Sequence, residues 1–432
     1  MNIILGLLLV LINLYVLTRS SDKGIKLYVI LTMISPVTIV LGVSLSYDYL
    51  FLPFVLIWAF QRYGINLKRV PLTTLLLAFY YVWLLVITTV TAIFDATATV
   101  EGISLIGTFK YVFLYALLSN EVSVREEFNN ILRTVIFVNC IVMLIEYILL
   151  MIYPDRDVIS LCIRLFTTSG SEGSLKAMYK FGEMGRLYGT FPSSAFPATL
   201  SIVGLGIFIN EYSISRSWKS IAGILGSVVI GFASSSKRFF LGAVLVVGLY
   251  FVLKPFFRTD KQASPLMRTY SKLPILIVAV SGAIYYLYTT LKDSLVIDYY
   301  LDYLINFRLL DSLSTRFGNN GVVNSMIPVI KNNLFTGVGE VSYSGIAVTD
   351  SFFFVTLYKS GIIGLFAFLV LFIVLFTNAM KARSMNAILV LAVVIFEFII
   401  STEFFSPMGI LFVAYVTNVV SHKEKKMVFC PR

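Results

Sequence analysis

The chain has 432 residues, of which 58% are hydrophobic and only 13% are charged. A soluble domain of this size cannot bury so much apolar surface, so much of it must face lipid. The composition excludes an ordinary soluble enzyme and predicts a membrane protein. The formal net charge is +11, which the usual excess of Lys and Arg in cytoplasmic loops explains. We therefore expect no nucleic-acid partner.

Histidine is almost missing, because His422 in the basic C-terminal tail is the only one. Histidine is the most versatile general base near neutral pH and a common metal ligand. Chemistry away from that tail must therefore use carboxylates, arginines, lysines or hydroxyls. The three cysteines, Cys140, Cys162 and Cys430, lie in an apolar run, a polar loop and the far end, and they predict neither a disulfide framework nor a metal site.

Apolar runs recur along the whole chain and predict an all-α polytopic membrane protein. The expected architecture is one domain, 1–432, containing a bundle of about 12 or 13 transmembrane helices. The first run lacks the charged start and cleavage site of a signal peptide, so we expect a retained helix. Pro36 and Pro53 favour a broken or re-entrant pair over 27–60. The predicted helices are 2–18, 27–45, 48–60, 70–93, 105–119, 131–152, 191–210, 220–234, 239–253, 274–290, 352–377, 387–401 and 407–420.

Lysine and arginine set the expected orientation. One set of alternating loops, which includes the C-terminal tail, holds roughly two-thirds of these cations and is predicted to be cytoplasmic. Two long loops, 153–190 and 291–351, are then on the outer side. Long loops in a compact protein tend to carry function, so we expect the site there.

The first outer loop ends with Arg186, shortly before a helix that begins near Pro192. Helix N-termini and guanidinium groups both attract phosphate. Arg186 is therefore a candidate for binding a phosphorylated ligand. The alternative is an interfacial arginine whose side chain reaches the lipid headgroups.

The short outer turn 234–238 consists of three serines followed by Lys237 and Arg238. These two cations lie on the outer side, against the general charge bias. We therefore expect them to bind an anionic ligand, and the alternative is a simple charged turn.

The second outer loop has two parts. Residues 298–317 carry apolar side chains at helical spacing and predict an amphipathic helix on the membrane surface or over the bundle. The following segment contains Gly337 and Gly339, which suit a tight turn.

Glu340 and Asp350 are carboxylates expected near the outer boundary of the membrane. Asp350 directly precedes an apolar helix, so it is either a helix N-cap or a general base. Other ionisable residues are scattered through the helices and do not form the dense carboxylate relay of an ion-coupled transporter. They are Lys110, Glu146, Lys359, Glu397 and Glu403.

Together these motifs resemble the O-antigen polymerase and O-antigen ligase superfamily. The resemblance covers roughly residues 186–368, whereas the N-terminal third agrees only in hydropathy. The matching positions are Arg186, Gly189, Phe191 and Pro192, then 234–238, then Arg316 and Phe317, and finally 332–339, Asp350 and 361–365.

The resemblance implies a GT-C-like fold with two large outer loops. Members transfer polyprenyl-diphosphate-linked glycans on the outer face of the bacterial cytoplasmic (inner) membrane, with no nucleotide sugar and no obligatory metal, so we expect no cofactor. Their arginines hold the diphosphate leaving group, where fixed positive charge is effective. The implied substrate-binding residues are Arg186, Lys237, Arg238, Arg316, Gly337 and Gly339, and the implied catalytic residues are Asp350, Glu340 and Arg238.

Ligases of the superfamily typically carry a histidine before the helix that follows the glycine-rich segment. Here that neighbourhood holds Asp350, which favours a polymerase of O-antigen, capsule or exopolysaccharide repeats. The expected partners are the lipid-linked oligosaccharide, membrane lipids, a flippase and a chain-length regulator. The alternatives are a ligase that transfers glycan to a lipid or protein, and a polysaccharide flippase or other transporter. A flippase would require a charged central cavity and two similar halves, and the sequence shows neither.

Overall fold

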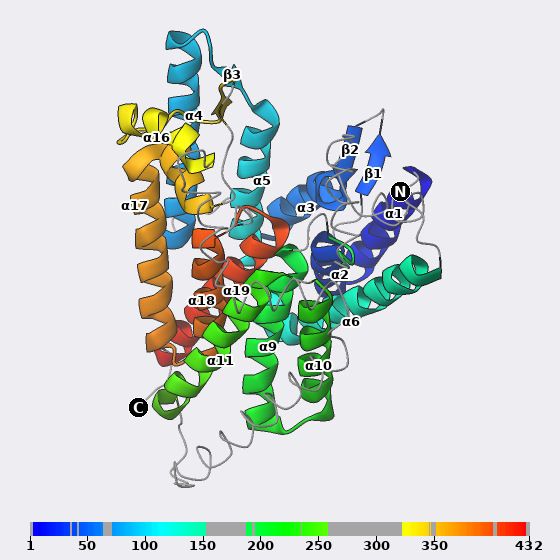
Figure 1. Ribbon diagram of the computed structural model, residues 1–432. Helices are drawn as coiled ribbons and strands as arrows, with labels where there is room; N and C mark the ends of the chain where they lie inside the picture. The colour runs from blue at the N-terminus through cyan, green and yellow to red at the C-terminus, as the bar shows by residue number, and fades with distance from the viewer. Residues whose placement is uncertain are drawn as a thin grey trace.

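The computed structural model describes residues 3–34, 37–40, 43–63, 71–152, 187–191, 195–234, 236–257, 322–344, 346, 351–400 and 404–428. This part of the chain is a bundle of helices with two short antiparallel strand pairs (Figure 1). The helical class expected from the composition is confirmed, and the strands are an addition that the apolar pattern did not predict. The elements are α1 (Ile3–Arg19), α2 (Ser21–Ile34), β1 (Val37–Val40), β2 (Val43–Ser46), α3 (Tyr47–Tyr63), α4 (Leu72–Phe94), β3 (Thr99–Val100), α5 (Gly102–Leu118), α6 (Val122–Ile152), α9 (Ala195–Ser215), α10 (Trp218–Ala233), α11 (Lys237–Phe257), α16 (Val322–Asn332), β4 (Val341–Ser342), α17 (Phe352–Lys381), α18 (Met385–Ile400) and α19 (Pro407–Val428).

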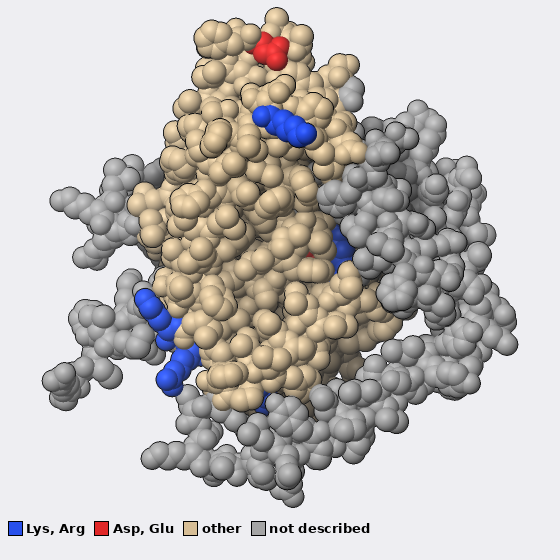
Figure 2. Space-filling view, turned by 60° about the vertical axis from the view of Figure 1, so that its left-hand side comes forward, with Lys and Arg blue, Asp and Glu red and all other residues tan. Residues whose placement is uncertain are grey.

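Five of the described helices are long and apolar enough to cross a membrane: α4, α9, α17 and the greater parts of α6 and α11. Six further apolar helical stretches have 10–17 residues, so length supports part of the predicted bundle. Large apolar side chains lie on the outside, such as Phe94 and Val244, which are 84% and 75% exposed. Figure 2 shows the result as a broad surface with few charged atoms. Such a surface is suited to lipid rather than to water.

Many helix boundaries lie close to the predicted runs, but α6 begins at Val122 rather than 131 and α19 continues to Val428 rather than 420. Helix α16 was not predicted. The largest difference in kind lies near the N-terminus. The run 27–45 is not one helix, because α2 ends at Ile34 and β1 and β2 form a hairpin that pairs Val37 with Ser46. Position 36 is a proline, which cannot donate a helical hydrogen bond and disfavours a helical residue before it. The predicted helix 274–290 and the predicted amphipathic helix 298–317 lie outside the described residues.

Helix α9 is central and packs against α6, α10, α11 and α18. Close approach to α10 depends on small residues: a Cβ on Gly204 would overlap the hydroxyl of Ser227. The hydroxyl of Ser201 also donates to the carbonyl oxygen of Ser227. Small residues are the usual means by which helices pack closely in a membrane. This packing gives a rigid support to the first turns of α9, where Thr199 lies.

Cationic connections gather at one end of the bundle. Figure 1 places the α9–α10 connection and the C-terminal ends of α11 and α17 together at its lower edge. This cation-rich end carries Arg216, Lys219, Lys254, Lys381 and Arg383. The β3–β4 pair lies at the opposite end (Figure 1), as the alternation of charged loops predicts.

Aromatic rings fill the space between α17, α18 and the start of α19. The ring of Phe398 lies 5.2 Å from those of Phe352 and Phe368, and Phe352 lies 5.4 Å from Phe404. Tyr80 of α4 meets Phe368 edge-on at 4.7 Å. Edge-on contacts of this kind add to the stability that burial provides. The cluster fixes the segment 404–406, which borders the site described next.

Candidate functional site

A buried ion pair joins α11 to α18. Arg238 lies in the first turn of α11, and its Nη1 is 3.7 Å from Oε2 of Glu397. Thr199 of α9 donates its hydroxyl to the other carboxylate oxygen, Oε1, at 2.8 Å. The side chain of Glu397 is 6% exposed and that of Arg238 is 19% exposed. The arginine therefore reaches the surface, while the carboxylate lies behind it.

Glu397 also lines a small cavity. Its volume of about 20 Å³ is enough for a single ordered water molecule. Thr199 and Ser406 are polar groups of its lining, which is otherwise largely apolar and includes Phe404 and Phe412. The hydroxyl of Ser406 accepts a hydrogen bond from the Gly409 amide at 3.0 Å, in the first turn of α19. The cavity is too small for a sugar, so a glycan would have to bind elsewhere.

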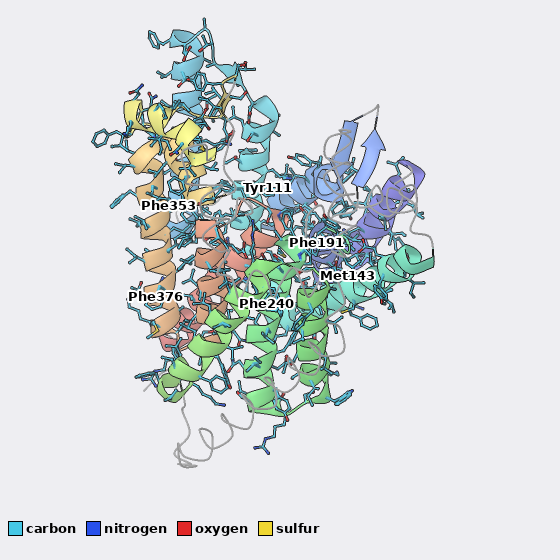
Figure 3. All side chains as sticks on the ribbon, viewed as in Figure 1. Tyr111, Met143, Phe191, Phe240, Phe353 and Phe376 are labelled. Carbon is cyan, nitrogen blue, oxygen red and sulfur yellow. The ribbon has the colours of Figure 1, made fainter. Side chains whose placement is uncertain are left out.

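The described end of the first long loop, 187–191, is attached beside the 234–238 turn. The amide of Leu187 donates to the carbonyl oxygen of Ala233, the last residue of α10, at 3.0 Å. In Figure 3 the labelled Phe191 and Met143 mark where this segment meets α6. Arg186 lies outside the described residues, but its neighbour Leu187 is thus fixed close to the 234–238 turn.

Two buried polar side chains of α6 hold this segment. Glu146 Oε2 accepts hydrogen bonds from the amides of Tyr188 and Gly189, at 3.1 and 2.9 Å. Asn139 Oδ1 accepts from the Thr190 amide at 3.0 Å. Gly189 has a φ of +62°, and a Cβ there would overlap Asn139, so the turn requires glycine. The intramembrane charge of Glu146 therefore anchors a loop, a role that its sequence position did not reveal.

The second long loop also ends near Glu397. The hydroxyl of Ser351 donates to the carbonyl oxygen of Ile399, two residues after Glu397 in α18. Ser351 occupies the N-cap position of α17. The alternative interpretation of Asp350 as the N-cap is therefore wrong by one residue. Asp350 itself lies outside the described residues.

A second polar centre lies where α17 is interrupted. Gly361 has φ 63° and ψ −162°, values that only glycine adopts readily, and the helical hydrogen bonds stop there. The glycine-rich segment 334–339 supplies replacements: Val338 and Gly339 donate to the carbonyl oxygens of Tyr358 and Lys359 at 3.0 and 2.7 Å. Ile362 donates in turn to the carbonyl oxygen of Leu334 at 2.9 Å. Non-helical backbone at membrane depth needs such partners.

Gly337 and Gly339 take part in this contact through their backbone. Both have positive φ, at 70° and 83°, as the predicted tight turn requires. A Cβ on Gly337 would overlap the backbone between Lys359 and Ser360, and one on Gly339 would lie 2.5 Å from Thr88 Cα. Their positions favour a packing role, because the space next to each α-carbon is filled by α17 or α4.

Glu340 follows this turn and is 3% exposed. Its carboxylate is paired with the amino group of Lys359 and accepts a hydrogen bond from Ser104 at 2.8 Å. Its amide donates to Thr88 Oγ1 at 2.8 Å. These contacts join α4, α5 and α17 and favour a structural clamp at Glu340. At the same end of the bundle, Asp95 accepts hydrogen bonds from the amide and the hydroxyl of Thr97. These bonds hold the pKa of Asp95 below its ordinary value.

Lys110 of α5 forms a third charged centre. It is 2% exposed, and its Nζ lies 3.4 Å from the ring centroid of Tyr49 and 4.4 Å from that of Tyr111. Tyr111 is labelled in Figure 3, and its ring stacks on Phe405 at 6.3 Å. Contact with ring faces is a favourable environment for a desolvated ammonium. Lys110 thus links α5 to α3 through Tyr49, and its neighbour Tyr111 contacts the 404–406 segment.

The structure brings only part of the predicted site together. Arg238 meets Glu397, which the sequence had marked only as a scattered membrane charge. Charges inside apolar helices usually pair with one another, and this rule could have identified Glu397 as a partner for Arg238. Gly337, Gly339 and Glu340 lie in the segment that packs against the interruption of α17, and the aromatic cluster of Phe352 and Phe398 packs around the α17–α18 contact. The other predicted groups lie outside the described side chains: Arg186, Lys237, Arg316 and Asp350.

No family model matches the chain, and no curated protein matches it.

Proposed function

We propose that this protein is a glycosyltransferase that joins polyprenyl-diphosphate-linked oligosaccharide repeats into a polysaccharide at the outer face of the bacterial cytoplasmic membrane. One observation carries the proposal: Arg238, a cation at the end of the bundle opposite to Lys254, is held by a buried carboxylate among apolar helices. The end of the second long loop, at Ser351, attaches to α18, which carries Glu397, and the end of the first, at Leu187, attaches to the last residue of α10, shortly before Arg238 in the chain.

In this proposal the guanidinium of Arg238 stabilises the diphosphate leaving group. Fixed positive charge in a site of low dielectric is effective where negative charge develops in the transition state. Arginine suits this role because its planar fork binds phosphate oxygens in pairs. Arg186, Arg316 and Lys237 would add further cations, and Asp350 would accept the proton of the attacking sugar hydroxyl.

Glu340 is a weaker candidate for the base than Asp350. A base must be able to approach a sugar hydroxyl within hydrogen-bond distance. Glu340 is buried and already bound by Lys359 and Ser104. The observations therefore support a structural clamp at Glu340 and leave Asp350 as the base in the proposed mechanism.

The decisive experiment is deletion of the gene in its source cell, followed by analysis of the carrier lipid. Loss of a polymerase leaves single repeat units on the lipid at the outer leaflet, and wild-type protein restores polymer whereas Arg238→Ala does not. Complete polymer left on the carrier would instead indicate a ligase. Single repeats confined to the inner leaflet would indicate a flippase. A normal carrier pool and normal polysaccharide after deletion would refute all of these functions.

A further inference from the structure

The pair Arg238–Glu397 differs in geometry from a second arginine–carboxylate pair, the partly buried Arg133–Glu211, in which α9 takes part. Arg133 Nη2 contacts both carboxylate oxygens of Glu211, at 3.0 and 3.1 Å, which are hydrogen-bond distances. Arg238 Nη1 stays 3.7 Å from Glu397 Oε2, so charge attraction holds it without a short hydrogen bond to that oxygen. The first geometry is typical of a permanent link, and the second leaves the guanidinium able to change partner.

From this geometry we propose that Glu397 is a positioning residue for Arg238. It orients the guanidinium before the substrate arrives and then yields it to the diphosphate. The proposal rests on the function proposed above, because that function supplies the diphosphate. A phosphate group offers two oxygens to one guanidinium at hydrogen-bond distance. It therefore competes well with a carboxylate that sits 3.7 Å away.

The surroundings of Glu397 fit such an exchange. A buried carboxylate that releases its cation must keep other polar contacts. Thr199 already donates a hydrogen bond to Oε1, and the adjoining cavity has space for one water molecule. Thr199 thus keeps a hydrogen bond to the carboxylate of Glu397 while Arg238 turns to the ligand. The difference in exposure, 19% for Arg238 and 6% for Glu397, means that a ligand at the surface meets the arginine first.

The proposal predicts opposite effects on binding and turnover. Glu397→Gln keeps the size of the side chain and a hydrogen-bond acceptor for Thr199, but it removes the charge that competes with the ligand. Phosphate binding should then become tighter, because the charge of Glu397 no longer competes with the ligand for the guanidinium. Turnover should fall, because the guanidinium is no longer held in its working orientation. If Glu397 had only a structural role, Glu397→Gln would weaken phosphate binding and lower the stability of the protein together.

The test uses the full-length protein in phosphatidylcholine nanodiscs, with inorganic pyrophosphate as the binding probe. Wild type should bind pyrophosphate, and Arg238→Ala should lose that binding. Glu397→Gln should bind pyrophosphate more tightly than wild type, by a factor of about five or more. The matched control is Glu211→Gln, the same substitution in the Arg133 pair near the other end of α9, and it should leave pyrophosphate affinity unchanged. Glu397→Asp, which keeps the charge but shortens the side chain, should retain the wild-type affinity and reduce kcat.

Several results would overturn the exchange: absence of pyrophosphate binding in wild type, an affinity that Glu397→Gln leaves unchanged, or weaker binding together with a lower melting temperature. The proposed function is tested separately, by polymer formation. If Glu397→Gln tightens binding through Arg238 while wild type makes no polymer, the exchange stands and the polymerase function fails. If wild type makes polymer and Glu397→Gln has no effect on pyrophosphate affinity, the function stands and the exchange fails.

Discussion

Trp83 of α4 donates its indole N–H to the carbonyl oxygen of Ser360 at 3.1 Å, directly before the interruption of α17. With the amides of Val338 and Gly339 on the two preceding carbonyl oxygens, three consecutive carbonyls released by the break find new donors. A buried carbonyl without a partner is costly, and more so in lipid. The break is therefore a built feature of the fold that depends on residues from three separate segments.

Gly361→Ala should strongly destabilise the protein. Alanine is strained at φ 63° and ψ −162°, and its Cβ would overlap the carbonyl oxygen of Phe335. We expect a loss of about 2 kcal/mol or more, measured by thermal unfolding of the purified protein in detergent. The matched control is Gly248→Ala in α11, where a Cβ would meet no atom within 4 Å. That variant should melt at or slightly above the wild-type temperature, and equal melting of the two variants would contradict the assigned break.

Glu340→Gln should lower stability by about 3 kcal/mol, because it leaves the ammonium of Lys359 buried beside a neutral amide. The double variant Glu340→Gln with Lys359→Met should recover part of the loss, since it removes both charges. Melting temperatures of the single and double variants test this coupling. A Glu340→Gln protein that melts normally but makes no polymer would show instead that Glu340 is the base.

Asp350→Asn should preserve folding and reduce polymer formation by about 10²-fold or more, the usual scale for loss of a general base. Asp350→Ala should fold as well, because the N-cap position of α17 belongs to Ser351. Both variants would be compared with wild type for melting temperature and for polymer made from lipid-linked repeats. Normal polymer with Asp350→Asn would remove this residue from the mechanism.

Labelling of single cysteines should place the two ends of the bundle on opposite sides of the membrane. In a background without the three native cysteines, Ser344→Cys near β4 should react with an impermeant maleimide in intact spheroplasts. Ser215→Cys, at the cation-rich end, should react only after lysis. Both serines are exposed, so access to reagent is the only variable. The reverse pattern would turn the proposed active site to the cytoplasm.

Apolar runs in the sequence located most of the described helices, including α4, α9 and α17, because a long apolar helix satisfies its own backbone in lipid. The charge bias also placed the cationic connections at one end. Local signals of this kind act within a few residues and need no information about distant segments. For the same reason the positive φ of Gly337 and Gly339 followed from the glycine-rich turn.

Tertiary structure alone decided which distant residues share a site. Arg238 and Glu397 are far apart in sequence, and nothing local in either segment names the other, since charge pairing depends on distance in space. Packing of α9 against both α11 and α18 brings the two charges together. The same holds for Glu340 and the break in α17, because the break is stable only where Trp83 and the 334–339 backbone meet it. Sequence thus determined most of the described helices, and long-range packing determined the charged centres between them.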